Sequence, residues 1–164
     1  QKNDDAIAAY DSGRCDAYTA GVGALAGQRI KLKAPDEHTI MTDLISNDPQ
    51  GPVTRWGDDR WQTIVRWVLN GTIAAEALGV TSKNVDDMKA NSKNAEVRRL
   101  LGVEGNFGAM LGLPNDWMYQ VIKQVGNYSE SYERTVGMGS PLKLKRGANE
   151  LWTKGGLLFT PPFQ

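Results

Sequence analysis

The chain has 164 residues, of which 40% are hydrophobic and 23% charged, and its 19 Lys and Arg residues balance 19 Asp and Glu residues. This composition is typical of an ordinary globular protein, and its neutral balance gives no support for binding to nucleic acid or to an anionic membrane surface. No apolar stretch reaches the roughly 20 residues that span a bilayer, so the chain is not expected to insert into a membrane. No signal peptide is recognisable, which leaves a mature, a truncated or a cytosolic chain open.

The first part of the chain is predicted to form a helix, a strand and a second helix. Residues 3–12 begin with a capping Asn3 and early acidic residues, and Gly13 is well placed to end the helix. Residues 14–19 alternate partly between polar and apolar side chains, as a strand does. A glycine-rich turn over 21–27 then opens the second helix. This order is typical of an α/β fold.

Two more strands are expected before the chain becomes helical. A turn at 35–38 precedes residues 39–45, which favour a strand, and a polar linker at 46–52 leads to a short candidate strand at 53–55. A parallel sheet of two or three strands cannot bury both of its faces. Either the rest of the chain is a separate helical domain, or the layer that should cover these strands lies outside the sequence.

From Asp58 onward the pattern is helical. Asp58 or Asp59 caps a first long helix and Gly79 ends it. Its apolar stripe includes Trp61, Ile64, Val65 and Val68, with Leu69 and Ile73 continuing it. Further helices are expected from Thr81, over 95–101, from a capping Asn115 and over 129–136, with a last turn or two at 149–154. The stripe is expected to face missing chain, a second copy or a swapped element.

Most of the tryptophans are expected to have structural roles. Trp61, Trp67, Trp117 and Trp152 occur in helical patterns and are expected in the core, whereas Trp56 lies in a linker and is expected to be exposed.

The chain has one cysteine, Cys15, and one histidine, His38. A zinc site needs three or four clustered ligands, so neither a metal site nor a cofactor is expected. A catalytic Cys-His dyad could only join these two residues, and neither lies in a catalytic motif. We interpret them as a small buried thiol and a surface loop histidine.

Three glycines invite comparison with a nucleotide-binding motif. Gly21, Gly23 and Gly27 nearly match the dinucleotide fingerprint, but the third glycine is one residue late and no acidic residue follows at a convincing distance. A tight turn that exposes backbone N–H groups to a cleft is the preferred interpretation.

Several separated blocks, in a fixed order, carry a more specific signal. They are NDDAIAAY at 3–10, SGRCDAYT at 12–19, GPVTR and GDD within 51–59, LGLPNDW at 111–117, IKQVGNYSE and YER within 122–134, and NELWTKGGL at 149–157. Together these blocks resemble the periplasmic amino-acid-binding proteins of ABC transporters, in particular the branch with general L-amino-acid specificity. The resemblance runs from about Asn3 to about Pro162.

The resemblance implies a type II periplasmic-binding-protein fold, in which two α/β lobes joined by a hinge clamp a ligand between them. Residues 1–52 would be the end of the second lobe. Residues 53–164 would return to the first lobe and end in a helical C-terminal segment packed on it. Complete family members are longer, so the chain is expected to lack the first-lobe sheet, the start of the second lobe and the arginine that grips the ligand carboxylate.

The implied function is capture of an amino acid or a related small polar metabolite for an ABC importer. The implied partners are that small-molecule ligand and the transporter's membrane subunits, in the periplasm of a Gram-negative bacterium. Two other classes stay open. One is a dehydratase-like or lyase-like enzyme on the same fold, and the other is a stand-alone interaction module, against which the missing sheet argues.

The resemblance also implies a ligand site and a disulfide. Family members usually place an aspartate just after the Tyr-Thr pair, where it accepts the ligand ammonium. Aligning Tyr18-Thr19 puts Gly21 at that position. We therefore expect Thr19, Ala20 and Gly21 to line the cleft, and the ligand not to be a simple α-amino acid. Because disulfides persist in the periplasm, Cys15 is expected to pair with a cysteine outside this chain.

Overall fold

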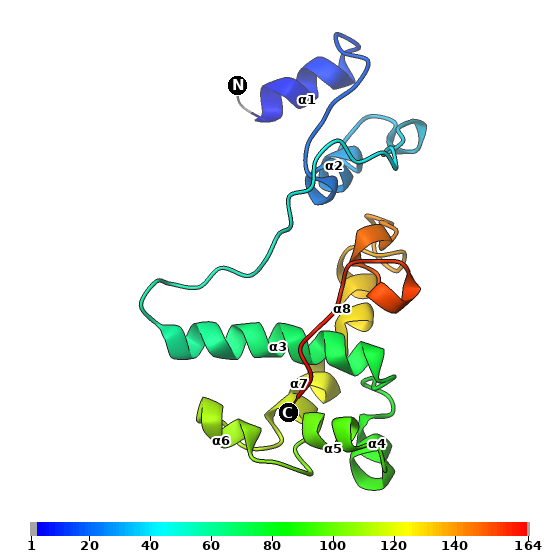
Figure 1. Cartoon of the computed structure of the whole chain (residues 1–164). Coiled ribbons are helices and arrows are strands. Elements are labelled where there is room, and N and C mark those ends of the chain that lie inside the picture. The colour runs from blue at the N-terminus through cyan, green and yellow to red at the C-terminus, as the bar shows by residue number, and fades with distance from the viewer. Residues whose placement is uncertain (1–2, 164) are drawn as a thin grey trace. The chain divides into compact units, whose positions relative to one another are not determined.

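A computed structural model describes residues 3–163, whose contacts divide the chain into two compact units. The first unit runs to Gln50 and includes Val136–Lys145, and the second comprises Gly51–Thr135 and the segment from Arg146 onward. Figure 1 labels the helices. Within residues 3–163, no helix combines the length and the apolar character that crossing a membrane requires.

Within its described residues, the first unit contains two short α-helices and one turn of 3₁₀-helix. They are α1 (Asn3–Asp11), α2 (Val22–Arg29) and η1 (Pro35–Glu37). The helix predicted at 3–12 is confirmed, and Gly13 follows it with a φ of 74°, a left-handed angle that favours glycine. The helix expected from the glycine-rich turn is confirmed as α2.

Polar contacts hold much of the first unit together. The hydroxyl of Tyr10 lies 2.7 Å from Nδ1 of His38, which joins α1 to the end of η1. Arg29 donates a hydrogen bond of 3.0 Å to the carbonyl of Leu142, 113 residues away in sequence. Ala26 is the one hydrophobic residue of this unit that is buried among those described. The unit therefore has little apolar core of its own.

None of the three expected strands forms within residues 3–163. Residues 14–19, 39–45 and 53–55 are coil, and the bridge recorded among the described residues is an isolated parallel one between Leu151 and Leu158. A strand leaves its N–H and C=O groups for a neighbouring strand to satisfy, and no described segment supplies that neighbour. The expectation of strands in this chain is therefore wrong, and the α/β class is not confirmed.

The described part of the second unit is a set of six α-helices followed by two 3₁₀ turns. They are α3 (Asp59–Ala77), α4 (Val85–Asn91), α5 (Ala95–Leu100), α6 (Phe107–Leu111), α7 (Trp117–Val125), α8 (Tyr128–Thr135), η2 (Gly147–Asn149) and η3 (Trp152–Lys154). Asp58 caps α3 as predicted, because its carboxylate accepts the N–H of Trp61 at 3.0 Å. α3 packs against α5, α6, α7 and α8.

The loop between α5 and α7 depends on Asn115 in a way that the sequence did not predict. Asn115 was expected to cap a helix, but the residue at the N-cap of α7 is Asp116. The Asn115 amide instead donates to the carbonyls of Gly102 and Gly105, at 2.9 and 3.0 Å, and its oxygen accepts the N–H of Gly108. This one side chain organises a loop that also contains the unpredicted helix α6.

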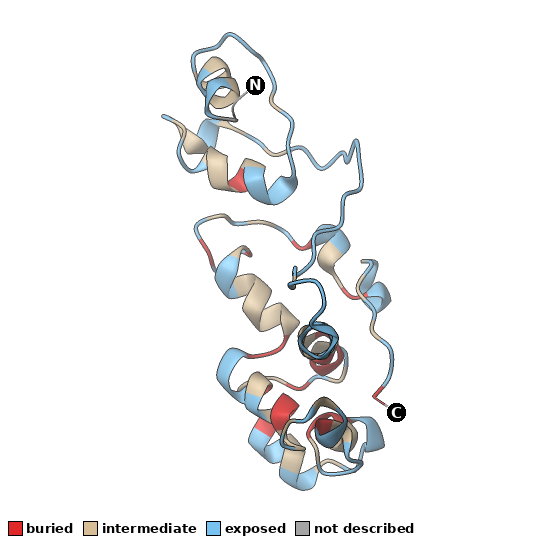
Figure 2. Ribbon diagram, turned by 90° about the vertical axis from the view of Figure 1, so that its left-hand side faces the viewer, coloured by how far each residue is buried: buried red, intermediate tan, exposed pale blue. Residues whose placement is uncertain are grey.

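The core of the second unit lies between the C-terminal half of α3 and the helices α5 and α7. Figure 2 shows buried residues gathered in these helices. Gly71 of α3 allows the side chain of Met118 in α7 to approach α3 closely, since a Cβ at position 71 would lie 2.2 Å from the Met118 sulfur. The largest fully buried side chains are Leu100, Leu101, Met118, Ile122, Val80, Val85 and Val97.

The tryptophans divide between core and surface. Trp117 is buried and Trp67 packs against the core, as expected. Trp61 is 53% exposed and Trp152 is 67% exposed, so the expectation that both belong to the core is wrong. Trp56 is exposed, as expected. Trp61 and Trp152 lie where the helical pattern is present but no described segment covers the side chain.

A buried ion pair joins α3 to the C-terminal segment. Arg146 donates to both carboxylate oxygens of Glu76, at 2.6 and 3.0 Å, and both side chains are at most 6% exposed. Arg146 also donates to the carbonyl of Asn149 and lies over the rings of Tyr128 and Tyr132. Burial lowers the pKa of Arg146, but hydrogen bonding to Glu76 and the nearby negative charge outweigh it and raise that pKa.

A second polar contact fixes the start of α8. The side chain of Asn127 accepts the N–H of Glu130, and the Glu130 carboxylate accepts the N–H of Asn127, which is a reciprocal capping box. The same carboxylate accepts the hydroxyl of Ser82 at 2.6 Å. Burial raises the pKa of Glu130, but hydrogen bonds from Ser82 and Asn127 outweigh burial and lower it. Glu130 therefore ties α8 to the loop before α4.

We predict that Glu76→Ala destabilises the second unit by about 3–5 kcal/mol, because the buried Arg146 guanidinium loses both hydrogen bonds to the Glu76 carboxylate and keeps only the Asn149 carbonyl and the more distant Glu150 carboxylate. The matched control is Glu104→Ala, which removes the exposed Glu104–Arg98 pair and is expected to lower stability by at most about 1 kcal/mol. Urea unfolding of the three proteins measures both effects. Equal destabilisation by the two variants would show that the buried Glu76–Arg146 pair contributes no more to stability than the exposed Glu104–Arg98 pair.

We also predict that the stabilising effect of Glu130 depends on pH. Because folding lowers its pKa, the effect is present above the unfolded pKa of about 4.3 and is lost as the pH falls through the folded value. Glu130→Gln should therefore lower the unfolding free energy by about 1.5–3 kcal/mol at pH 7, and the difference from the parent should shrink under acid. Denaturant unfolding across this pH range, with the exposed Glu96→Gln as control, shows whether the stability difference shrinks on acidification as expected. A difference that grows on acidification would refute it.

Candidate functional site

The three residues expected to line a ligand cleft lie together at the entrance to α2. Thr19, Ala20 and Gly21 form part of a coil segment that runs directly into the helix, and all three are exposed. Tyr18, which precedes them, is half-buried. The structure therefore places these residues side by side on an accessible part of the first unit.

Gly21 is the N-cap residue of α2. Its backbone is extended, with φ −58° and ψ 141°, and its carbonyl accepts the N–H of Leu25 at 2.9 Å. No side chain at this position caps the helix. The first N–H groups of a helix have no partner within it, so the N-terminus of α2 offers donors on the exposed side of the segment.

The fold itself does not require glycine at position 21. The φ angle lies in a region open to every residue, and no atom lies within 4 Å of the place where a Cβ would stand. Aspartate is among the residues that N-cap positions favour. The missing carboxylate is therefore not explained by backbone strain or by crowding, and the position could hold one.

Two contacts fix the other end of α2, and the sequence had not singled them out. Ala26 is fully buried, and Arg29 in the last turn reaches the carbonyl of Leu142. A cation in the last turn also suits the negative end of a helix dipole, which is the one signal that the sequence offered. These contacts fix the C-terminal half of α2, and the position of its exposed N-terminus is thereby fixed within the first unit.

The alternatives based on single residues are not supported by the local geometry. Residues 14–20 form no strand before α2, so the context that a dinucleotide fingerprint needs is not present there. Cys15 is exposed, which corrects the expectation of a buried thiol. It lies in a coil segment whose neighbouring residues are exposed as well. The hydrogen-bond partner of His38 is Tyr10, and no dyad with Cys15 is formed.

Other charged groups are already engaged with one another. Lys123 donates to the hydroxyl of Tyr119 and to the carboxylate of Asp86, and these hydrogen bonds raise the pKa of Lys123 to about 12. The pKa of Asp86 is lowered by its hydrogen bonds with Tyr119 and Lys123. Residues 3–163 contain no group of three or more His, Cys, Asp or Glu side chains that could hold a metal ion.

Comparison with known proteins gives high similarity along nearly the whole chain. The general L-amino acid-binding periplasmic protein AapJ of Rhizobium johnstonii is 52% identical over 157 residues, which cover 94% of this chain and 46% of that protein. The putative amino-acid ABC transporter-binding protein YhdW of Escherichia coli K12 is 48% identical over 98% of this chain and 47% of its own length. No protein-family model matches the sequence.

A third relative and a solved structure show the same similarity to periplasmic binding proteins. The glutamate/glutamine/aspartate/asparagine-binding protein BztA of Rhodobacter capsulatus is 41% identical over 94% of this chain and 46% of its own length. A periplasmic binding protein of an ABC transporter from Brucella ovis, solved with glutathione bound, superposes with a TM-score of 0.89 at 48% identity, covering 99% of this chain. The resemblance to periplasmic amino-acid-binding proteins of ABC transporters is confirmed.

The match also defines how much of such a protein is present. The chain spans about half the length of the curated relatives it matches and 51% of the solved one, and the matched half is the C-terminal one. These relatives are named as binding proteins or transporter components, and nothing in them supports the enzyme alternative. The structural match is consistent with part of a two-lobe fold.

Proposed function

We propose that this chain is the C-terminal half of an extracytoplasmic solute-binding protein, which carries a small polar ligand to the membrane subunits of an ABC importer in a Gram-negative periplasm. The observation that carries the proposal is similarity to such proteins at 41–52% identity over at least 94% of the chain. Residues 1–52 would belong to the second lobe, and residues 53–164 to the return into the first lobe.

Thr19, Ala20 and Gly21 would line the cleft between the lobes. Their exposure and their place at the open N-terminus of α2 support this assignment. A ligand ammonium buried at Gly21 would meet no carboxylate from this position, and a buried charge without a partner is strongly unfavourable. We therefore propose a ligand that does not present its ammonium there. The Brucella ovis relative, with bound glutathione rather than a free amino acid, supports a broader ligand class.

Gly21 supplies a direct test of this proposal. A chimera that joins this chain to the N-terminal half of the Rhizobium johnstonii relative provides both lobes, and calorimetry measures its binding of glutamine, leucine and glutathione. Gly21→Asp should strengthen binding of the two amino acids by about 10- to 150-fold, the worth of a hydrogen bond to a charged group. Gly21→Asn, which also suits the N-cap but carries no charge, is the matched control and should give a much smaller gain.

Two results would count against the proposal. Binding of glutamine or leucine by the unsubstituted chimera at micromolar affinity or better would refute the ligand class. An equal effect of aspartate and asparagine would show that position 21 does not meet an ammonium. Recovery of unchanged ligand after incubation separates a binding protein from an enzyme, which would consume it.

Cys15 gives a prediction about the longer protein. Its thiol is free and exposed in this chain, and disulfides persist in the periplasm. In a non-reduced protein that includes the N-terminal half, we expect Cys15 in a disulfide with a cysteine from that half. Mass spectrometry of peptides prepared without reductant detects the cross-link. Quantitative alkylation of Cys15 under the same conditions would rule the disulfide out.

A further inference from the structure

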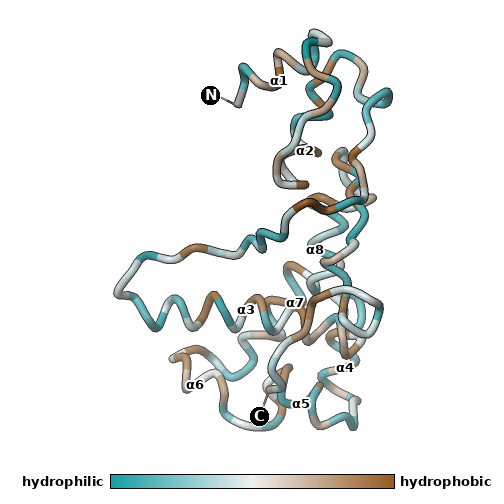
Figure 3. Tube along the Cα trace, turned by 45° about the horizontal axis from the view of Figure 1, so that its top comes forward, coloured by the Kyte–Doolittle hydropathy of each residue, from teal (hydrophilic) through white to brown (hydrophobic). Residues whose placement is uncertain are grey.

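One contact in the first unit joins two segments that lie far apart in the sequence. Arg29, in the last turn of α2, donates from Nη2 to the carbonyl oxygen of Leu142 at 3.0 Å, and the contact is partly buried. Leu142 belongs to the loop 136–145, which forms part of the first unit. Four of the eight residues of α2 are Ala, Leu or Val and the last two are Gln28 and Arg29, a change of character that can be followed in Figure 3. A polar contact therefore anchors the end of a largely apolar helix.

The loop is ordered by hydrogen bonds of its own. Leu144 donates its N–H to the carbonyl of Val136 at 3.0 Å, which brings the two ends of the loop together. Inside the loop, the hydroxyl of Ser140 donates to the carbonyl of Gly137 and accepts the N–H of Leu142. Both Gly137 and Ser140 are buried. The segment that receives Arg29 is therefore a built structure rather than a loose connection.

The carbonyl of Leu142 is held in one direction. The N–H of the same peptide, which belongs to Lys143, donates to the carbonyl of Ser140 at 3.3 Å. In a trans peptide the N–H and C=O groups point to opposite sides, so the Leu142 carbonyl points away from Ser140, where Arg29 reaches it. Lys143 has a φ of 50°, a left-handed angle that a residue other than glycine keeps where its surroundings impose it. The loop thus presents a fixed acceptor.

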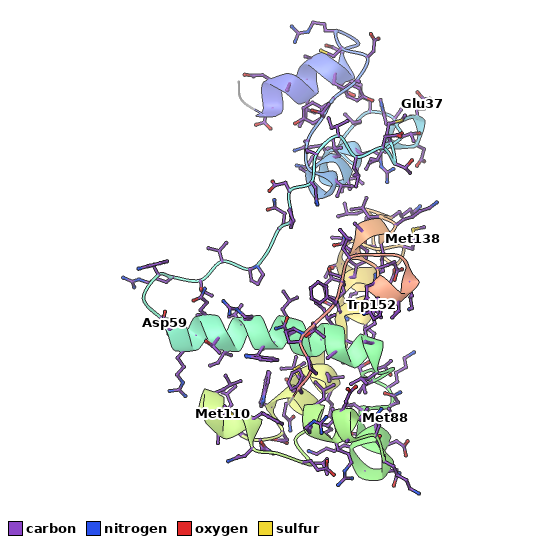
Figure 4. The ribbon with its side chains drawn as sticks, viewed as in Figure 1. Glu37, Asp59, Met88, Met110, Met138 and Trp152 are labelled. Atoms are coloured by element: carbon purple, nitrogen blue, oxygen red, sulfur yellow. The ribbon has the colours of Figure 1, made fainter. Side chains whose placement is uncertain are left out.

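Both ends of the loop continue into ordered structure. The chain enters the loop from α8, which ends at Thr135, and leaves it at Arg146, whose guanidinium is buried against Glu76. Met138, labelled in Figure 4, lies in the loop and is 57% exposed. The order of the loop therefore comes from its hydrogen bonds and its fixed ends rather than from burial of this large side chain.

We propose that Arg29 is a positioning residue for ligand binding, because it fixes α2 on the 136–145 loop and thereby fixes the segment Thr19–Gly21 at the other end of the helix. This inference rests on the proposed function, which places that segment in the cleft. The helix separates Gly21 from Arg29 by about 12 Å, at about 1.5 Å per residue, so Arg29 acts through the helix. A site that is fixed before its ligand arrives binds more tightly, because less conformational entropy is lost on binding.

Hydrogen exchange of this chain tests the contact without any ligand. Arg29→Met keeps an apolar stem and a high helix propensity but removes the donor. It should speed exchange of the α2 amides and of the Leu144 amide by at least about 10-fold, because a locally opened segment exchanges faster. The amides of α7 in the second unit should be unaffected. Lys31→Met, which removes an exposed cation in the turn after α2, is the matched control and should change neither segment.

The chimera described above tests the positioning role. Arg29→Met should weaken binding of whichever of glutamine, leucine and glutathione the parent chimera binds by at least about 5-fold, the lower end of the usual coupling between distant sites. Arg29→Lys restores a donor and should recover part of the loss, and Lys31→Met should bind like the parent.

A double substitution separates positioning from a general loss of stability. The gain in amino-acid binding expected from Gly21→Asp should shrink when Arg29→Met is combined with it. Sites about 12 Å apart ordinarily act additively, so this coupling would have to pass through α2. A variant that is merely less stable would bind less tightly without linking the two ends of the helix.

A shortened loop tests the other partner of the contact. Because the N–H of Leu144 meets the carbonyl of Val136, residues 137–143 can be replaced by Asn-Gly, a two-residue turn closed by the same hydrogen bond. This variant has no acceptor for Arg29, so it should weaken ligand binding as Arg29→Met does. Adding Arg29→Met to it should cause no further loss. The exchange of the α7 amides should again be unchanged.

Three outcomes would overturn the proposal. Unchanged exchange of α2 in Arg29→Met would show that the contact does not hold the helix. Faster exchange of α2 together with equal ligand affinities of Arg29→Met and Lys31→Met would show that the contact holds the helix but does not position the site. A parent chimera that binds none of the three ligands would contradict the proposed function and with it the role of Arg29 in binding, whereas the exchange measured on the chain alone would still report on the contact.

Discussion

Every backbone N–H and C=O group that leaves water needs a hydrogen-bond partner, and this requirement separates the parts of the chain that fold alone from those that do not. A helix satisfies the groups in its interior from within its own segment. A strand depends on another segment, which can lie far away in sequence or outside the chain. The helices of the second unit accordingly form around a core, whereas the segments with strand-like side chains remain coil.

The helices of the second unit are joined by a small number of polar contacts that act over long sequence separations. Arg146 and Glu76 are 70 residues apart, and their pairing connects α3 to the chain that follows α8. Near the C-terminus, Arg99 donates to the carbonyl of Phe163 at 2.7 Å, and the ring of Phe163 packs edge-on against Trp67. The C-terminal segment, drawn in orange and red in Figure 1, is thus held at Arg146 and again at Phe163.

Local signals predicted the local structure well. The cap at Asp58, the glycine at position 13 and the apolar periodicity of α3 and α7 each depend on residues a few positions apart, and the corresponding helices are present. Strands were predicted wrongly because side-chain preference is local while strand pairing is not. Exposure of Trp61 could not be foreseen for the same reason, since a helical pattern does not reveal what covers it.

The candidate site was predicted partly from local sequence and partly from family resemblance. The position of Gly21 at the entrance to a helix followed from its glycine-rich context, and the structure confirms that helix. Its proposed role came from family resemblance alone. The contact between Arg29 and Leu142, which steadies α2, spans 113 residues and left no local pattern in the sequence. Tertiary contacts of that range were not accessible to sequence reasoning here.

The open space around Gly21 has an evolutionary consequence. Every glycine codon becomes a codon for aspartate or glutamate through a single change at its second base. At most positions in a folded protein, such a change would meet a crowded neighbour or a backbone angle reserved for glycine. Here neither obstacle exists. Gain and loss of an acidic group at the head of α2 are therefore separated by one mutational step that the fold tolerates. Under the proposed function, that single step would change the charge that the cleft offers to a ligand without rebuilding the fold.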